Sequence, residues 1–149
     1  MKLKVETNNL SQAPVQNAFL FKVIKETLAF NDFRYLNEKN IVVSVALISS
    51  QEIKRLNKTY RKKNSITDVL SFAEYKSEKE LKQIGDKNIF LGEIILCYND
   101  IEKYAQEKSK SVKQEVAKVI SHGLLHLLGF QHSKKMFQLQ DAVAENYNQ

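Results

Sequence analysis

Apolar residues recur along this chain with two different periods, and the period distinguishes strands from helices. Four short segments show the alternating or continuous apolar pattern that is typical of β-strands. One of them, IVVSVALI, is almost wholly apolar and rich in β-branched residues, which predicts a central strand. The four predicted strands are Lys2–Glu6, Ile41–Ile48, Val69–Tyr75 and Ile89–Cys97.

Helical spacing of apolar residues marks other segments. Ser49 is followed three residues later by Glu52, which is the signature of a capping box at a helix start. The polar run Arg61–Ser65 is predicted to be a loop, and Lys76–Asn88 a mobile connection with room for a helical turn. Besides the helix after Ser49, helices are predicted over Val15–Phe30, from a cap at Asn99 or Asp100 to about Lys108, and over Lys134–Tyr147.

The most apolar helix is predicted from Val112 to about Leu128. Ser111 precedes it, with Gln114 at the capping-box position, and Gly129 follows as a residue suited to the left-handed backbone that ends many helices. Apolar residues surround most of its axis, which is typical of a helix buried in the core. The whole pattern predicts an α+β fold: a small mixed β-sheet of about four strands, helices packed on it, and one buried helix near the C-terminus.

Length and composition are typical of one globular domain over residues 1–149. The apolar fraction of 43% and the charged fraction of 27% exclude a mostly disordered chain. No apolar run approaches the roughly 18 residues of a membrane span, and the N-terminus has no signal-peptide core. The single cysteine, Cys97, excludes an internal disulfide. We therefore expect a cytoplasmic protein without membrane association.

Lysine gives the chain a basic balance. Lys and Arg total 23 against 17 Asp and Glu, for a formal net charge of +6. This balance permits binding to nucleic acid or another polyanion. A lysine-rich, solvated surface is the simpler explanation, so charge alone identifies no ligand.

All three histidines of the chain lie in one short segment, HGLLHLLGFQH. On a helix, His122 and His126 are about 40° apart around the axis and about 6 Å apart along it, so both can reach one ion. Gly129 lets the chain turn and bring His132 back to the same place. Three protein ligands leave the fourth position of a tetrahedral ion open, which is the usual layout of a catalytic zinc. We therefore predict one zinc ion per chain.

Two other interpretations fit these histidines less well. They could be ordinary core and surface residues, but bare burial of an imidazole costs about 1–3 kcal/mol, and one metal ion satisfies two rings at once. The spacing also matches the ligands of metzincin proteases, whose general base is a Glu beside the first His. Here Gly123 holds that position and cannot take a proton.

The histidine segment resembles the HGxLHLxGYDH signature of the YbeY family of small bacterial rRNA maturation factors. Two further segments resemble family motifs in the expected order: LNKTYRKK with the TDVLSF that follows it, and LGEI. Three positions depart from the family pattern. Gln131 and Glu93 stand where Asp is usual, and Ala73 stands where Pro is common. None of the three is a predicted metal ligand.

The resemblance implies an α+β fold with the metal in a cleft beside the sheet. It also implies a metal-dependent, single-strand-specific endoribonuclease in rRNA maturation, including 16S rRNA 3′-end processing and ribosome quality control. Arg61 would project into the cleft and be needed for activity, since a guanidinium can hold two phosphate oxygens and offset transition-state charge. The neighbouring Lys58, Lys62 and Lys63 are candidates for contacts with the RNA backbone.

We therefore hypothesise an endoribonuclease in which His122, His126 and His132 hold zinc and Arg61 holds the scissile phosphate. Its partners would be single-stranded RNA, above all rRNA, and proteins of the small ribosomal subunit. The nucleophile stays open between a water at the metal and the 2′-hydroxyl of the RNA. The main alternative is a non-catalytic assembly factor with a structural zinc that binds rRNA or a ribosomal protein. A metallohydrolase acting on a small phosphate ester is a third interpretation.

Overall fold

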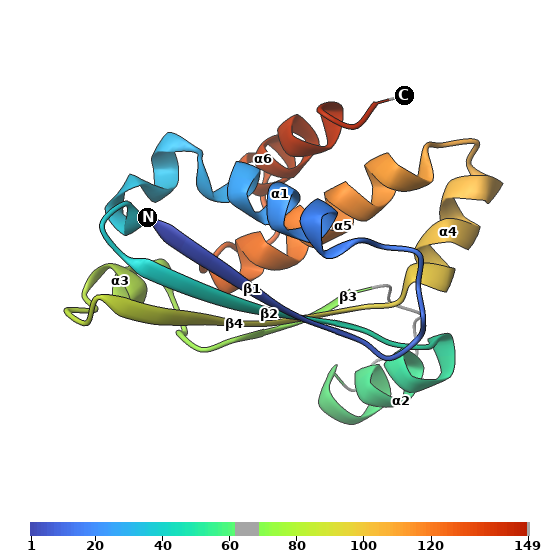
Figure 1. Cartoon of the computed structure of the whole chain (residues 1–149), viewed down its shortest axis with the longest axis horizontal. Coiled ribbons are helices and arrows are strands. Elements are labelled where there is room, and N and C mark those ends of the chain that lie inside the picture. The colour runs from blue at the N-terminus through green and yellow to red at the C-terminus, as the bar shows by residue number, and fades with distance from the viewer. Residues whose placement is uncertain (62–68, 149) are drawn as a thin grey trace.

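The computed structural model describes residues 1–61 and 69–148, and for Arg61 it describes the backbone only. Strands and helices alternate through most of these ranges, and three helices close the chain (Figure 1). The elements in chain order are β1 (Lys2–Asn9), α1 (Asn17–Leu28), the 3-10 helix η1 (Asn31–Leu36), β2 (Asn40–Leu47), α2 (Ser50–Arg61), β3 (Val69–Ala73), α3 (Glu78–Lys82), β4 (Asn88–Leu96), α4 (Tyr98–Glu107), α5 (Val112–Leu127) and α6 (Lys134–Glu145).

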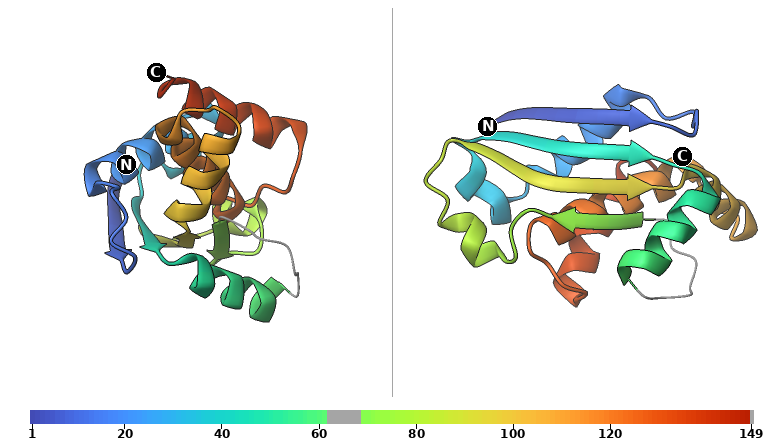
Figure 2. Two further views of the ribbon diagram at one scale, coloured as in Figure 1. Left: turned by 90° about the vertical axis from the view of Figure 1, so that its right-hand side faces the viewer. Right: turned by 90° about the horizontal axis from the view of Figure 1, so that it is seen from below.

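The four strands form one mixed sheet in the order β1-β2-β4-β3 (Figure 2). β1 pairs with β2 and β2 pairs with β4 in parallel, whereas β3 runs antiparallel to β4 at one edge. The β2–β4 register shifts between Val42 and Val43, where Leu91 is the extra residue of a bulge. The predicted α+β fold with a mixed four-stranded sheet is thus confirmed, and the segment IVVSVALI is a central strand.

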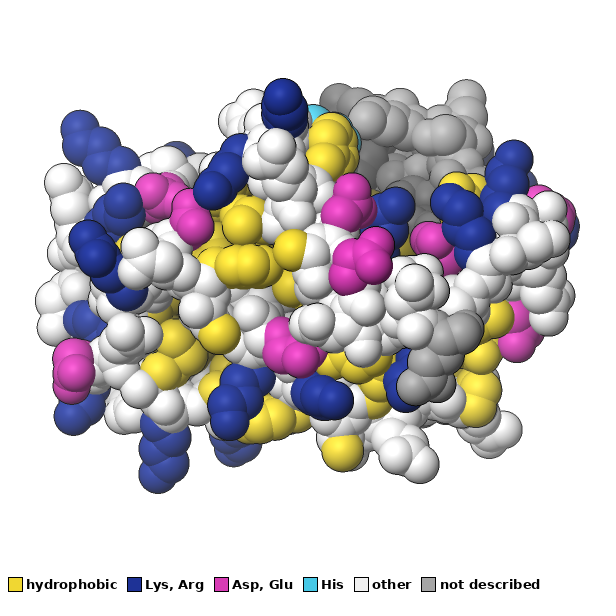
Figure 3. Space-filling model, turned by 90° about the horizontal axis from the view of Figure 1, so that it is seen from above, with side chains coloured by type: hydrophobic (Ala, Val, Ile, Leu, Met, Phe, Trp, Pro, Cys, Tyr) yellow, Lys and Arg dark blue, Asp and Glu magenta, His cyan; other side chains and the backbone are white. Residues whose placement is uncertain are grey.

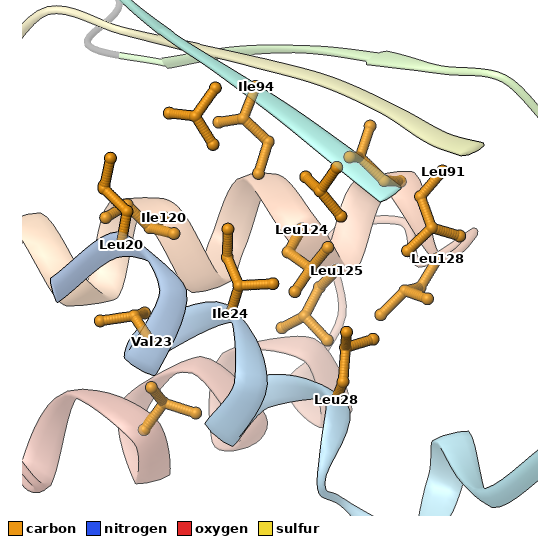
Figure 4. Packing of buried hydrophobic residues seen from close by; sticks show 14 of the residues in the cluster. Leu20, Val23, Ile24, Leu28, Leu91, Ile94, Ile120, Leu124, Leu125 and Leu128 are labelled. Carbon is orange, nitrogen blue, oxygen red and sulfur yellow. The ribbon is translucent and has the colours of Figure 1, made fainter. Parts of the chain in front are cut away.

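The two faces of the sheet carry different amounts of structure. Helices α1, α4, α5 and α6 lie over one face, and α2 lies over the other (Figures 1 and 2). A large hydrophobic cluster fills the first side, where Ile94 of β4 lies close to Leu124 of α5 and Ile24 of α1 (Figure 4). The cluster on the α2 side is much smaller. Its buried members among the described residues are Ile48, Ile53, Leu70, Ile95 and Cys97.

Helix α5 runs through the middle of the large cluster, as its sequence predicts. Its cap is Ser111, whose Oγ accepts a hydrogen bond from the Gln114 N–H at 3.2 Å. Gly123 lets the helix approach the sheet, because a Cβ there would lie 3.0 Å from Ile94 Cγ2 and 3.2 Å from Ser71 Oγ. Ser71 of β3 also donates a hydrogen bond to the Gly123 carbonyl at 3.2 Å. These contacts fix α5 against the β3 edge of the sheet.

Two local predictions are wrong. The prediction of a loop at Arg61 fails because α2 continues to that residue. Arginine is a good helix former, so a polar residue need not mark a loop. The rest of that predicted loop lies outside the described residues. Neither Asn99 nor Asp100 caps α4, because the cap residue is Cys97 and both polar residues lie in the first turn. A carboxylate in a first turn is stabilised by the helix dipole.

One short helix was not predicted from the sequence pattern, and a second lies where the pattern left room for a helical turn. The 3-10 helix η1 follows α1 and buries Phe33 and Leu36. Helix α3 lies within the connection before β4; Ser77 caps it by accepting a hydrogen bond from the Glu80 N–H at 3.1 Å, and Leu81 anchors it in the core. No helix in the two described ranges has the length and apolar character needed to cross a membrane.

Candidate metal centre

The three histidines lie together at the C-terminal end of α5. His126 Nε2 is 3.1 Å from His122 Nε2 and 3.2 Å from His132 Nε2. One ligand nitrogen from each residue can be chosen so that all lie within 4.8 Å of one another. His122 and His126 are partly buried, whereas His132 is exposed. The cluster is therefore anchored in the protein on one side and accessible from solvent on the other.

Local backbone structure explains why these residues meet. His122 and His126 are one turn apart on α5 and so share a face of the helix. After the helix ends, Gly129 adopts a φ of +97°, which glycine tolerates and other residues rarely do. Its N–H donates to the His126 carbonyl at 3.0 Å, as in a Schellman turn. A side chain at this position would also meet the backbone nitrogen of Glu78, 2.5 Å from its Cβ. The turn brings His132 back beside the helix.

Two hydrogen bonds orient the ligand nitrogens. His122 Nδ1 lies 2.6 Å from Oε1 of Gln140, a buried residue of α6, and His126 Nδ1 lies 2.9 Å from the Phe130 carbonyl oxygen. Because both oxygens accept, we assign the proton of each ring to Nδ1, which leaves a lone pair on each Nε2. Hydrogen bonds of this kind set the tautomer and ring orientation of histidines that bind metals.

The arrangement fits a metal ion better than it fits three bare imidazoles. With the protons on Nδ1, the Nε2 atoms of His122 and His126 face each other as two acceptors. Two nitrogen ligands of a tetrahedral zinc ion, each about 2.05 Å from the metal, are about 3.3 Å apart. The observed separations of 3.1 and 3.2 Å are close to that value. The cluster could therefore hold a metal ion, and imidazole nitrogens suit zinc, copper or nickel.

Two residues of α6 that the sequence analysis does not single out complete the site. Gln140 holds His122, and Phe137 lies three residues earlier, on the adjacent turn of the same helix. The Phe137 ring is within 11° of parallel to the His122 ring, at 6.4 Å between centroids, and lies 5.9 Å from the His132 ring. A signal for Gln140 does exist in the sequence. An amide within the apolar stripe of a helix needs a hydrogen-bond partner when buried.

A groove with a volume of about 300 Å³ adjoins this cluster and is lined in part by His122 and Gln140. This volume is at the lower end of small-molecule sites, which span about 300–1,000 Å³. Its other walls include Tyr104 of α4 and Lys118 of α5. Lys118 Nζ lies 3.6 Å from a carboxylate oxygen of Asp141, so the lysine charge beside the groove is partly balanced.

The predicted RNA-contacting residues are only partly described. Lys58 is exposed on α2, which lies across the sheet from α5 (Figure 1). The Arg61 side chain, Lys62 and Lys63 lie outside the described residues, so their roles stay predictions. Figure 3 shows a histidine surface beside a hydrophobic side chain, with basic and acidic side chains interspersed over the rest of that face.

Glu93 and Cys97 lie on the α2 face of the sheet, away from the histidines. Neighbours in a strand point to opposite faces, and Ile94 belongs to the large cluster. Glu93 Oε2 accepts a hydrogen bond from Oγ of Ser44, its cross-strand partner, at 3.3 Å. Cys97 is a fully buried core residue, and burial raises the pKa of its thiol. The departure from the family pattern at Glu93 therefore lies away from the histidine cluster.

The chain is similar to known proteins over nearly its whole length. The family model described as Endoribonuclease YbeY matches residues 5–148. Endoribonuclease YbeY of Staphylococcus aureus, in strains JH9 and Newman, is 35% identical over 133 residues, which cover 85% of this chain and 86% of the relative. The solution structure of a Thermotoga maritima protein is similar with a TM-score of 0.58 and 28% identity, over 95% of this chain and 87% of that one. The range that the family model matches, residues 5–148, includes all three histidines.

Proposed function

The chain belongs to the YbeY family of endoribonucleases, and on that basis we propose that it uses a zinc ion to cleave single-stranded regions of ribosomal RNA. Family membership supports a nuclease role in rRNA processing, and hence a hydrolase that acts on RNA phosphodiester bonds. The observation that carries the metal-dependent part is the convergence of three histidine nitrogens within 4.8 Å. We further propose that residues 1–149 act as one catalytic domain in the cytoplasm.

Zinc suits the donor set of the cluster. Three imidazole ligands with one open position are the layout of catalytic zinc sites, and we propose one ion held by His122, His126 and His132. When bound, the ion would act as a Lewis acid that polarises a phosphoryl oxygen or lowers the pKa of a water molecule. Gln140 and the Phe130 carbonyl hold two of the rings in place. The exposure of His132 leaves a side from which a phosphodiester can approach.

We assign the scissile phosphate to Arg61 and weaker contacts with the RNA backbone to Lys58, Lys62 and Lys63. The similarity of LNKTYRKK to a family motif supports this assignment. A guanidinium that holds two phosphate oxygens stabilises the charge that builds up on them in the transition state. The lysine contacts would weaken as salt concentration rises, because each one releases counterions from the RNA. The 3′ end of 16S rRNA, presented with small-subunit ribosomal proteins, is the proposed substrate.

The other interpretations make different predictions. The relatives are named as endoribonucleases, which does not favour a non-catalytic assembly factor. Such a factor would bind rRNA with its zinc in place and leave the RNA intact. A hydrolase of small phosphate esters would turn over a small ester without RNA.

The first experiment is elemental analysis of the untagged protein beside His126→Ala. We expect close to one equivalent of zinc in the parent chain and a loss of zinc in the variant, with the circular dichroism of the fold retained. RNA cleavage by the parent chain should stop on chelation and return with added zinc. Absence of metal from the parent, even after zinc is added back, would remove the metal-dependent part of the proposal.

Arg61→Ala separates catalysis from binding of the metal. We expect it to abolish cleavage of a single-stranded RNA while zinc content and melting temperature stay those of the parent. Unchanged turnover would show that Arg61 is not catalytic. Analysis of the products distinguishes the nucleophiles: a 2′,3′-cyclic phosphate indicates attack by the RNA 2′-hydroxyl, and a free 5′-phosphate indicates attack by water.

A further inference from the structure

Phe137 is an exposed aromatic residue beside the histidine cluster, and the helix that carries it fixes its position. Helix α6 begins after Ser133, whose Oγ accepts a hydrogen bond from the Met136 N–H at 3.2 Å. Met136 is fully buried and Gln140 is buried against His122, yet Phe137 between them is 43% exposed. The two buried residues anchor the first turns of α6, and Phe137 is held on the solvent side of those anchors.

Its ring continues an aromatic surface that the histidines begin. The centroids of His122 and His126 are 4.6 Å apart, and those of His126 and His132 are 5.0 Å apart. The centroids of His122 and His132 are 5.2 Å apart, and the Phe137 ring contacts these two at 6.4 and 5.9 Å between centroids. Single exposed apolar residues are common on protein surfaces and need no explanation. This one differs because it borders the point where the proposed reaction takes place.

We propose that Phe137 forms a nucleobase-binding subsite next to the metal centre, an inference that rests on the proposed function. The base of a nucleotide whose phosphate lies at the histidine cluster stacks on the exposed part of the Phe137 ring. Stacking on an aromatic side chain accepts any base, because every base has a π-face. A base inside a duplex has both faces covered by its neighbours and cannot stack in this way. The subsite therefore selects for unpaired RNA without reading its sequence.

Phe137 could instead serve only to hold His122 and His132 in place. That positioning role and the stacking role differ in what they change. Loss of a positioning residue lowers zinc affinity and leaves the discrimination between bases and bare backbone untouched. Loss of a stacking residue leaves zinc affinity as it was and weakens binding only of ligands that carry bases.

The absence of tryptophan from the chain makes a direct test possible. Phe137→Trp introduces a single tryptophan at the subsite, and Phe21→Trp is the matched control, since Phe21 is 37% exposed on α1. Each zinc-loaded variant is titrated with a short single-stranded RNA, the DNA of the same sequence, and an abasic phosphodiester of the same length. We expect fluorescence quenching of Phe137→Trp by the RNA and the DNA, with little by the abasic strand, and no quenching of Phe21→Trp.

An unchanged Phe137→Trp signal under conditions where the RNA binds would overturn the subsite. Equal quenching by the abasic strand would overturn it as well, because that strand has no base to stack. Both outcomes can be read without any cleavage. If RNA and DNA quench Phe137→Trp but the parent chain never cleaves RNA, the nuclease function is refuted and the subsite stands.

Kinetics provide the second test. Phe137→Ala should raise KM for a single-stranded RNA, or weaken its affinity, by between about 5-fold and about 150-fold, the range found when base–aromatic stacking is removed. Phe137→Tyr should restore it, whereas Phe137→Leu, which keeps the apolar bulk, should not. Zinc affinity should be unchanged in all three variants. If Phe137→Ala cleaves RNA as well as the parent does, the subsite is refuted and the nuclease function stands. If the zinc affinity of Phe137→Ala falls in step with its activity, Phe137 is a positioning residue.

Discussion

Helices α5 and α2 lie against opposite faces of one sheet and are held there in different ways. α5 is surrounded by α1, α4, α6 and the sheet, and most of its circumference is buried. α2 covers a small cluster on the other face. Regions with fewer buried contacts open at a lower free energy. The two helices thus differ in rigidity, and the histidine cluster is built on the more rigid one.

This difference separates the two parts of the proposed catalytic machinery. His122 and His126 extend from the helix at the centre of the large core, so the positions of these two rings are fixed before any ligand arrives, and His132 follows the turn at the end of that helix. Arg61 and Lys58 belong to the helix on the thinner side. A metal site needs ligands placed within a few tenths of an ångström, whereas a long basic side chain can adjust to a phosphate. The more rigid support therefore holds the group that needs it more.

The largest effect is expected from a change in the large cluster. Leu124→Ala removes a fully buried side chain from α5 and leaves a cavity, which should lower the free energy of unfolding by about 2–5 kcal/mol. Urea unfolding measures this value. Because Leu124 lies between the two ligands on α5, zinc affinity should fall too. A variant that unfolds earlier but binds zinc as tightly as the parent would show that the cluster does not depend on this packing.

Ile53→Ala makes the corresponding change on the α2 side. We expect a smaller loss, about 2 kcal/mol, because a small cluster near the surface can collapse around the missing atoms. The single cysteine, Cys97, belongs to the same cluster and reports its opening. Its alkylation should be slow in the parent, where the thiol is buried, and faster in Ile53→Ala. Zinc content should stay unchanged. If Cys97 is alkylated as fast in Leu124→Ala as in Ile53→Ala, the two faces of the sheet open together and do not differ in rigidity.

Gln140→Leu tests the hydrogen bond that orients His122. Removing such a partner commonly costs about 10- to 100-fold in metal affinity, and we expect a loss in that range in a competition assay with a zinc chelator. Gln140→Glu keeps an acceptor at the same place and should lose much less. Gln138→Leu, at an exposed position of the same helix, controls for the change in composition. Similar zinc affinities for all three variants would show that Gln140 does not support the metal site.

The smallest effect is expected at Ser44. Ser44→Ala removes the hydrogen bond to Glu93 on the α2 face and should cost about 0.5–1 kcal/mol of stability. RNA cleavage and zinc content should be those of the parent, because neither residue lies near the histidines. A large fall in cleavage without a fall in stability would show that the α2 face of the sheet takes part in RNA cleavage.

The sequence predicts best what is encoded locally. Ser111, Gly129 and the spacing of the histidines determine a helix, its end and a cluster of three imidazoles within a few turns of chain, and the structure has all three features. The partner of His122 could not be predicted in this way, because Gln140 reaches it through the packing of α6 on α5. The role of Gly123 was also hidden. Its importance lies in the close approach of α5 to β3 and β4, which exists only once the sheet has formed.

The nearness of the three histidines in sequence has a consequence for the unfolded chain. A loop this short costs little entropy to close, so the denatured ensemble can also gather these imidazoles around an ion. A ligand stabilises a fold only by the difference between its affinities for the native and denatured states. Zinc would therefore raise the melting temperature less than an ion that joins distant segments does. A chelator should abolish cleavage and shift the thermal transition only slightly. The ion would then have a catalytic role and contribute little to the stability of the fold.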